Sequence, residues 1–386
     1  MGTDSRDSKR PEWQPEDAGA EFACRVMDGV ASGHDGISSY QKAAADAASG
    51  ASAPVFTRPA YTADDYAEGV LAGNRAVLGR AITLMESNAP KHIDMAQQVL
   101  QRLLPHSGKA IRVGITGVPG VGKSSFIEKF GCYLLEQGHK VAVLAVDPSS
   151  SISGGSILGD KTRMEQLSRD SRCFIRPSPA GTTLGGVARK TRESMLVCEA
   201  AGFDVMLIET VGVGQSETAV RSMVDFFLLL MLSGAGDELQ GIKKGIMELA
   251  DALVITKADG DNRLRAKTAQ GEYERAMHYL QPATEGWTSH AFTCSALTGE
   301  GIPEIWGVIK KFRQITQASG VFEQHRRDQN VKWVHEMIND QLHERFIRHA
   351  GVKSIIAGIE RQVADGVLPA VAATQRLLAA FDGLEA

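Results

Sequence analysis

A glycine-rich stretch at residues 114–130, GITGVPGVGKSSFIEKF, contains the residue types that bind phosphate groups. It fits the pattern G-x-x-x-x-G-K-[ST] at every fixed position, after an apolar run that reads as a strand and before a helical segment. In that context the backbone N–H groups of the loop and the N-terminus of the helix point at phosphate oxygens. The residues predicted to bind nucleotide here are Gly117, Val118, Pro119, Gly120, Val121, Gly122, Lys123, Ser124 and Ser125.

The last residues of this loop have specific roles in nucleotide chemistry. Lys123 is a catalytic candidate because its ammonium group is expected to bridge the β- and γ-phosphates. The hydroxyl of Ser124 is expected to bind Mg²⁺. A chance glycine-rich turn is the alternative, but the strand before the loop and the helix after it favour a P-loop. The sequence therefore predicts a nucleoside triphosphate and Mg²⁺ as ligands.

A second motif indicates which base is bound. Thr256, Lys257, Ala258 and Asp259 end the apolar run ALVITKAD and resemble the guanine-reading motif NKxD. An aspartate at the last position accepts hydrogen bonds from the N1–H and the exocyclic amine of guanine, which adenine does not offer. The stem of Lys257 is expected to cover the base. Thr256 replaces the usual asparagine, so we expect a weaker contact between this loop and the P-loop.

A third short sequence supports guanine over adenine. Ser295, Ala296 and Leu297 resemble the SAx loop whose backbone contacts guanine. Taken alone, Asp259 could be a capping residue before the Gly-Asp-Asn turn. With the P-loop and the SAx-like loop in the expected order, the sequence predicts GTP and GDP as the nucleotides.

Two acidic residues end apolar runs near the predicted phosphate site. Asp147 ends VAVLAVD, where it can approach the metal, and Glu209 ends VMLIET. Glu209 begins a sequence that resembles the DxxG switch motif, so it is expected to reach Mg²⁺ through water, with the N–H of Gly212 at the γ-phosphate. Each acid could instead be a strand-end cap. Gln215 is given no role, because the water-positioning glutamine of Ras-like GTPases directly follows that glycine.

The elements that must position these residues alternate between strand and helix. Short apolar runs alternate with helical segments between Ile111 and Leu297. This order predicts an α/β P-loop NTPase fold with a mostly parallel sheet and helices on both of its faces. Ligands of such sheets bind at the C-terminal ends of the strands, where Gly117, Asp147 and Asp259 occur.

The remaining sequence divides the chain into four regions. Residues 1–60 are rich in Ala, Gly, Ser and Asp and are predicted to be a flexible tail. Residues 61–108 carry apolar residues at three- and four-residue spacing, which predicts N-terminal helices. Residues 109–318 form the predicted GTPase domain. Residues 319–386 are predicted to be a C-terminal helical arm that dimerises.

Composition narrows the compartment and the partners. The net charge of −4 argues against nucleic acid or an anionic membrane as the main partner. The five cysteines form no CxxC pair and favour a reducing compartment. The start of the chain lacks the apolar segment of a secretory signal. The apolar run at 223–232 has about half the length of a membrane helix and reads as a buried strand.

Four longer stretches resemble one particular family of GTPases. They are DPSSSISGGSILGDKTRM at 147–164, RPSPAGTTLGGVAR at 176–189, ETVGVGQSE at 209–217 and GDELQGIKKGIMELAD at 236–251. Together they resemble the MeaB/ArgK/MMAA family, the SIMIBI-class G proteins that escort adenosylcobalamin-dependent acyl-CoA mutases. The resemblance covers about residues 61–350.

The resemblance implies a function, partners and further site residues. It implies a homodimer. It also implies that GTP hydrolysis by this protein gates the loading of adenosylcobalamin onto a mutase, such as methylmalonyl-CoA mutase, and that the protein protects or reactivates that mutase. An adenosyltransferase is a further partner. In the family, Asp147 and Glu209 match metal-site acids, Asp160 matches an acid of switch I, and Lys243 ends a third mobile segment. A cytoplasmic location is expected for a bacterial protein, whereas animal members are mitochondrial.

Three alternatives remain at this level. A nickel-delivery GTPase of the same class usually carries a His-rich tail or a Cys-based metal site, and the ten histidines here are scattered. A kinase, the origin of the ArgK label, would need an acceptor-binding feature that the sequence does not display. A nucleotide-holding scaffold without turnover is disfavoured by the complete set formed by Lys123, Ser124, Asp147 and Glu209.

Overall fold

The computed structural model describes residues 61–146, 164–177, 184–210, 216–234 and 244–383 of the chain. The predicted tail at 1–60 lies outside these ranges. Four candidate site residues also lie outside them and remain predictions: Asp147, Asp160, Gly212 and Lys243. Among the residues in the described ranges, no helix is long and apolar enough to cross a membrane.

A seven-stranded parallel sheet forms the centre of the described chain, as the alternating pattern predicted. The strand order is β3-β2-β4-β1-β5-β6-β7, so β1 lies between β4 and β5. Val113 of β1 pairs with Leu207 of β4 and with Phe226 of β5. The run FFLLLM forms β5 and is buried along its whole length, which confirms its interpretation as a core strand. The strands span Ile111–Gly117, Val141–Val146, Cys173–Arg176, Val205–Thr210, Phe226–Met231, Ala252–Ile255 and His290–Thr293.

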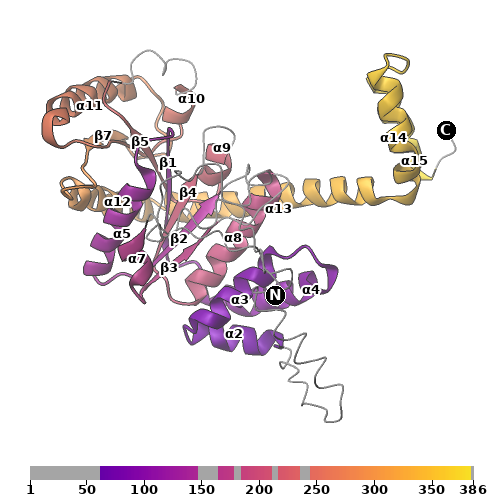
Figure 1. Cartoon of the computed structure of the whole chain (residues 1–386), viewed down its shortest axis with the longest axis horizontal. Coiled ribbons are helices and arrows are strands. Elements are labelled where there is room, and N and C mark those ends of the chain that lie inside the picture. The colour runs from indigo at the N-terminus through magenta and orange to yellow at the C-terminus, as the bar shows by residue number, and fades with distance from the viewer. Residues whose placement is uncertain (1–60, 147–163, 178–183, 211–215, 235–243, 384–386) are drawn as a thin grey trace, which may run out of the picture. The chain divides into compact units, whose positions relative to one another are not determined.

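The helices surround this sheet and extend beyond it at both ends of the described chain (Figure 1). In the described part of the chain, three α-helices precede β1, in the region where the sequence predicted N-terminal helices: α2 Ala63–Leu71, α3 Arg75–Glu86 and α4 Pro90–Leu103. The helices that connect the strands are α5 Lys123–Glu136, α7 Glu165–Arg169, α8 Leu184–Ala200, α9 Ser216–Arg221, α10 Lys244–Met247 and α11 Arg263–His278. After β7 follow α12 Ile302–Ala318, α13 Val321–Arg348, α14 Ala350–Ala364 and α15 Ala370–Asp382.

Alternation of side chains along the strands divides the core into two faces. On β5, Phe227 and Leu229 face one side, where α8, α9 and α11 cover the sheet and α2 to α4 pack over α8. Phe226 and Leu228 face the other side, together with α5, α7 and α12. Burial of large apolar side chains at about 25 cal/mol per Å² stabilises both layers. The strand ends that carry the predicted site are therefore held by a rigid, two-sided core.

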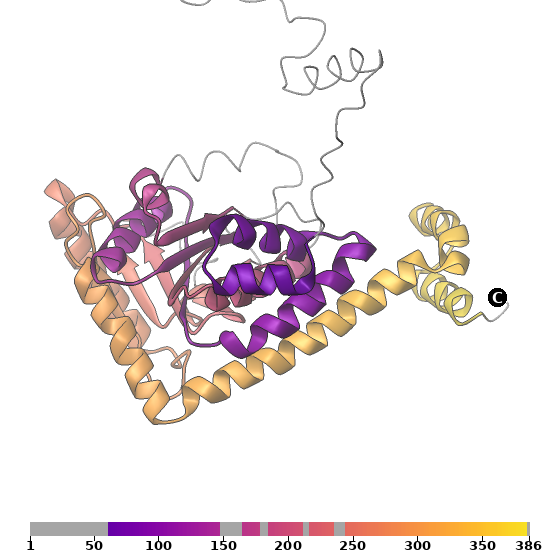
Figure 2. The same cartoon turned by 90° about the horizontal axis from the view of Figure 1, so that it is seen from below.

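The C-terminal helices leave the sheet along α13, which carries α14 and α15 at its far end (Figures 1 and 2). α14 and α15 pack on each other through a small cluster of Ile359, Leu368 and Ala373. The first turn of α13 contributes Phe322 to the main core. The arm is thus anchored at its N-terminal end.

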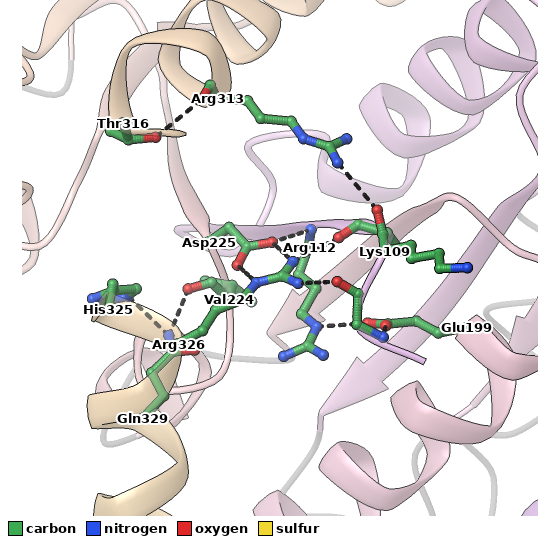
Figure 3. Close-up of polar contacts among 12 residues, drawn as sticks. Lys109, Arg112, Glu199, Val224, Asp225, Arg313, Thr316, His325, Arg326 and Gln329 are labelled. Atoms are coloured by element: carbon green, nitrogen blue, oxygen red, sulfur yellow. Dashed lines mark hydrogen bonds and ion pairs between the residues drawn. The ribbon is translucent and has the colours of Figure 1, made fainter. Parts of the chain in front are cut away.

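An ion pair and hydrogen bonds hold the start of α13 against the N-terminal ends of β1 and β5 (Figure 3). Arg326 donates through Nε and Nη2 to both carboxylate oxygens of Asp225, at 2.7 and 2.6 Å. The same guanidinium donates to the carbonyls of Gly108 and Ala110. Asp225 also accepts from the backbone N–H of Arg112 at 2.8 Å. The buried carboxylate of Asp225 therefore joins α13, β1 and β5 at the N-terminal ends of the strands, opposite the phosphate loop.

A second buried acid, Glu193 of α8, makes the stability of the fold depend on pH. Glu193 is 2% exposed, and burial raises its pKa from 4.5 to about 7, although Arg189 lies 3.5 Å away. The folded protein therefore holds this proton more tightly than the unfolded chain does. The contribution of Glu193 to stability is full below about pH 4.5 and decreases as the pH rises to about 7.

We predict that Glu193→Gln raises the free energy of unfolding at about pH 8 and leaves it nearly unchanged at about pH 5, since the amide needs no ionisation. Each pKa unit corresponds to about 1.4 kcal/mol, so the gain is on the order of 2 to 3 kcal/mol. Urea unfolding at both pH values measures it. The matched control is Glu199→Gln. It loses the 2.7 Å ion pair with Arg112 and should lower the free energy of unfolding at both pH values. An equal effect of Glu193→Gln at both pH values contradicts the prediction.

Candidate functional site

The phosphate loop leaves the sheet between β1 and α5, as the sequence predicted. Gly117 ends β1, and a Cβ built on it would lie 2.6 Å from the carbonyl oxygen of Leu230 on β5. No larger residue fits there, because the loop backbone passes directly against the neighbouring strand. Gly122 precedes α5 with a φ of 94°, a conformation that glycine adopts without strain. These two glycines turn the chain so that α5 begins at Lys123.

Lys123 lies folded over its own loop. Its Nζ donates to the carbonyl of Gly117 at 2.8 Å. Burial lowers the pKa of Lys123, and the negative charges of Glu209 and Glu217 oppose that shift. The ammonium group is therefore partly dehydrated and lies near two carboxylates, where a bound phosphate would compete for it. This is the arrangement expected of a lysine that neutralises phosphate charge.

Ser124 and Glu209 form a group of oxygen ligands beside the loop. The hydroxyl of Ser124 lies 3.4 Å from Oε1 of Glu209, and Glu209 is 5% exposed. Behind it, the hydroxyl of Thr210 donates to the hydroxyl of Thr116 at 2.8 Å and ties the end of β4 to β1. Hydroxyl and carboxylate oxygens are the ligands that Mg²⁺ prefers, so the described residues fit this ion.

The predicted guanine-reading loop is bonded directly to the phosphate loop. Thr256 is buried, and its hydroxyl donates to the carbonyl of Val121 at 2.6 Å. Nζ of Lys257 donates to the carbonyl of Gly120 at 2.9 Å. With threonine in place of asparagine the loop thus retains a direct hydrogen bond to the P-loop, through the hydroxyl of the shorter side chain. Lys257 also has a φ of 55°, a strained conformation typical of functional sites.

Asp259 is oriented by the loop that follows β7. The hydroxyl of Ser295 donates to Oδ2 of Asp259, and Ser295 is fully buried. The N–H of Ala258 donates to the carbonyl of Cys294 at 3.0 Å, so the two loops are joined by backbone as well. Leu297 lies in the same loop with 82% of its surface exposed. The two motifs that the sequence placed in separate strands therefore meet around one carboxylate.

Glu217 is a residue of this site that the sequence analysis did not single out. It lies in the first turn of α9, is 1% exposed, and is one of the two carboxylates whose charge acts on Lys123. Its position in the stretch ETVGVGQSE was visible in the sequence, but a glutamate in a helical segment gives no signal of burial. Only the packing of α9 against β1 and β4 places it near the phosphate loop.

The described residues thus form two connected parts. Lys123, Ser124 and Glu209 form a part suited to phosphate and a divalent cation. Thr256, Asp259 and the loop at Ser295 form a part suited to a base with two adjacent donors. Together they can bind a nucleotide at the C-terminal ends of β1, β4, β6 and β7.

A comparison with family models gives one match. The model described as "Methylmalonyl Co-A mutase-associated GTPase MeaB" matches residues 78–350. Among similar proteins, "GTPase ArgK" of Escherichia coli is 50% identical over 270 residues, which are 70% of this chain and 82% of that protein. "Methylmalonic aciduria type A homolog, mitochondrial" of Mus musculus is 48% identical over 323 residues, 81% of this chain and 78% of that protein.

A similar solved structure agrees with these matches. The crystal structure of "LAO/AO transport system kinase" superposes with a TM-score of 0.67 and is 38% identical. The alignment covers 83% of this chain and 97% of that one. The similarity therefore extends over most of the described helices and strands.

The base-reading carboxylate gives a direct test of the site. We predict that Asp259→Asn lowers the affinity for GDP at least about 100-fold and admits xanthosine diphosphate, because the amide donates where guanine also donates. Calorimetry measures the affinities of both proteins for GDP and for xanthosine diphosphate. The matched control is Asp261→Asn, an exposed acid two residues further along, which should bind GDP like the unchanged protein. Equal GDP affinity in both variants would remove Asp259 from the site.

Proposed function

Because the chain belongs to the family of methylmalonyl-CoA mutase-associated GTPases, we propose that its GTP hydrolysis gates the loading of adenosylcobalamin onto a B12-dependent acyl-CoA mutase. In this proposal the same cycle protects or reactivates the mutase. Similarity to a protein named for methylmalonic aciduria supports methylmalonyl-CoA mutase as the partner. An adenosyltransferase that supplies the cofactor is a further proposed partner.

One observation carries the nucleotide part of this proposal. Thr256 and Lys257 are hydrogen-bonded to the carbonyls of Val121 and Gly120, so the base-reading loop and the phosphate loop form one rigid unit. A nucleotide with both a guanine and a phosphate chain is then positioned at both ends by the same backbone. Fixed geometry of this kind is the main contribution that a protein makes to phosphoryl transfer.

Each described residue has a role in this proposal. Lys123 binds the β- and γ-phosphates and neutralises charge that develops as the terminal phosphate leaves. Ser124 would hold Mg²⁺, with Glu209 reaching it through water, and the ion would neutralise further charge on the phosphates. Asp259 binds the guanine edge, held in place by Ser295.

Four residues outside the described ranges complete the proposed site. Asp147 is assigned to the metal, Asp160 to the first switch segment, Gly212 to the γ-phosphate and Lys243 to the third mobile segment. Family membership favours this function over nickel delivery and over a kinase. For a bacterial chain we propose a cytoplasmic location, whereas the mouse relative is named mitochondrial.

An exposed apolar stripe on α13 supports a homodimer. Val331, Val334, Ile338 and Leu342 recur at three- and four-residue spacing along this helix, and each is between 47 and 58% exposed. This spacing places them on one face of the helix. A contiguous apolar surface of this kind usually marks a protein–protein contact. We propose that a second copy of the chain covers it.

Turnover with a partner tests the proposed function. We predict that adding methylmalonyl-CoA mutase raises the rate of GTP hydrolysis about 10-fold or more, less than the 10³–10⁵ that an arginine finger supplies. Phosphate release is measured with and without the mutase and adenosylcobalamin. Lys123→Ala should be inactive in both cases, because the phosphates lose their main cation. An unchanged rate with methylmalonyl-CoA and isobutyryl-CoA mutases would refute the partner but not the GTPase.

Oligomeric state tests the role of α13. We predict that the chain, of 41.4 kDa, has twice that mass in light scattering at micromolar concentration. The double change Val334→Asp with Ile338→Asp should give a monomer, because two buried charges would face each other across the contact. Leu264→Asp on α11, where the side chain is 78% exposed, is the control and should remain dimeric. A monomeric unchanged protein would end this proposal.

A further inference from the structure

A polar contact region joins α9, which follows the phosphate site, to α13, which carries the C-terminal arm. We call it the seam and define it by Arg192 of α8, Ser222 at the end of α9, and Gln329, Trp333 and Glu336 of α13. Elsewhere the helices on this face of the sheet pack through apolar side chains. Here a single buried guanidinium, from α8, makes polar contacts with both Ser222 and α13.

Arg192 contacts both helices at once. Its Nη2 donates to the carbonyl and to the hydroxyl of Ser222, at 2.9 and 2.8 Å. Its Nη1 donates to the carbonyl of Gln329 at 3.3 Å, and Glu336 lies 3.7 Å from Nη2. The guanidinium also lies over the ring of Trp333, 5.6 Å from its centre. Arg192 therefore shares its donors between α9 and α13.

The charge of Arg192 is poorly compensated in this position. The side chain is 6% exposed, whereas Glu336 is 42% exposed and beyond hydrogen-bond distance. Burial lowers the pKa of Arg192 to about 10. Among the described residues, Nε of Arg192 and Nε1 of Trp333 are buried donors without a hydrogen-bond partner. Unpaired buried donors cost free energy, so the contacts of Arg192 in the seam are not fully satisfied.

The other end of α9 is in the phosphate site. Glu217 lies in its first turn, and its negative charge acts on the ammonium of Lys123. A bound triphosphate would take over Lys123 and place further negative charge near this buried carboxylate. Filling the site therefore changes the force on the first turn of α9.

The far end of α9 is held by an ion pair, and cavities adjoin it on the side of α13. Arg221 donates to both carboxylate oxygens of Asp251, at 3.0 and 3.4 Å, and so fixes a pivot. Ser222 directly follows this pivot, so a rotation of α9 turns its acceptors relative to Arg192. Cavities of about 340 and 360 Å³ lie beside Ser222 and are lined by residues of α9 and α13.

We infer that Arg192 is a positioning residue that links occupation of the phosphate site to the placement of α13, by exchanging its bonds between Ser222 and the α13 acceptors. The path runs through contiguous contacts, and Arg192 bonds acceptors on both of its sides at once, so a shift of one side changes its bonds to the other. The inference rests on the proposed nucleotide site. If Arg192 were only a staple, its removal would loosen α13 equally in every nucleotide state.

Hydrogen exchange in the full-length protein tests this link. Amide exchange of residues 325–340 is compared with GDP and with a non-hydrolysable GTP analogue, both with Mg²⁺. We expect at least about a threefold difference in rate between the two nucleotides in the unchanged protein. In Arg192→Met the difference should vanish while GDP affinity stays within about threefold, since Arg192 touches no nucleotide-site residue.

Two kinds of control make the result decisive. Arg313→Met on α12 removes an arginine that also bonds a backbone carbonyl, that of Lys109, but lies outside the seam, and it should keep the difference. If Arg192→Met does not fold, Ser222→Ala and Glu336→Gln each weaken one side of the link, by loss of the hydroxyl acceptor and of the negative charge, and should reduce the difference.

The outcomes separate this inference from the proposed function. If the unchanged protein does not bind GDP in calorimetry, the proposed function fails and the link fails with it. If GDP binds but α13 exchanges equally in both nucleotide states, only the link is wrong. A nucleotide-dependent difference that survives in Arg192→Met, or in both replacement variants, overturns the role of Arg192.

Discussion

The close contact between Gly117 and the carbonyl of Leu230 is the constraint on which the site depends. It fixes the point at which the phosphate loop leaves β1, and it does so against β5, the strand that also pairs with β6. Because Thr256 directly follows β6, the predicted base-reading loop emerges within hydrogen-bond reach of Val121. The adjacency of three parallel strands therefore converts two distant motifs into one binding surface. A side chain at Gly117 would separate those strands and move every ligand contact.

At the N-terminal ends of the strands, opposite the phosphate loop, two buried carboxylates bond both backbone and arginine side chains. Asp225 and Asp251 stand just before β5 and β6, and each accepts a backbone N–H and an arginine, Arg326 and Arg221 respectively. Buried ion pairs contribute little net stability, because desolvation offsets most of their attraction. Their value here is orientation, since Arg326 belongs to α13 and Arg221 to α9. The apolar strands supply the stability, and the charged ends determine where α9 and α13 lie.

Helix α9 connects the phosphate site at the C-terminal ends of the strands with the carboxylates at their N-terminal ends. Its first turn contributes Glu217 to the surroundings of Lys123, and its last residue is bonded to Asp251. Beyond this pivot lies the seam, where polar contacts and cavities replace the close apolar packing of the core. A well-packed core resists small displacements, whereas a polar contact with spare donors can change partners at low cost. The sheet therefore provides a rigid site, and the helix surface beside it provides the part that can respond to a ligand.

The sequence by itself determined the strand–helix alternation and the phosphate loop, and it predicted which residues read the base. Each of these is a local pattern: apolar runs of strand length, glycines at fixed spacing, and an acid at the end of a strand. The tertiary structure alone decided that Thr256 keeps its bond to the phosphate loop, that Glu217 is buried beside Lys123, and that Arg192 joins two helices. Burial and contact depend on which distant segments meet, and no local pattern records that a charged helical residue faces the interior.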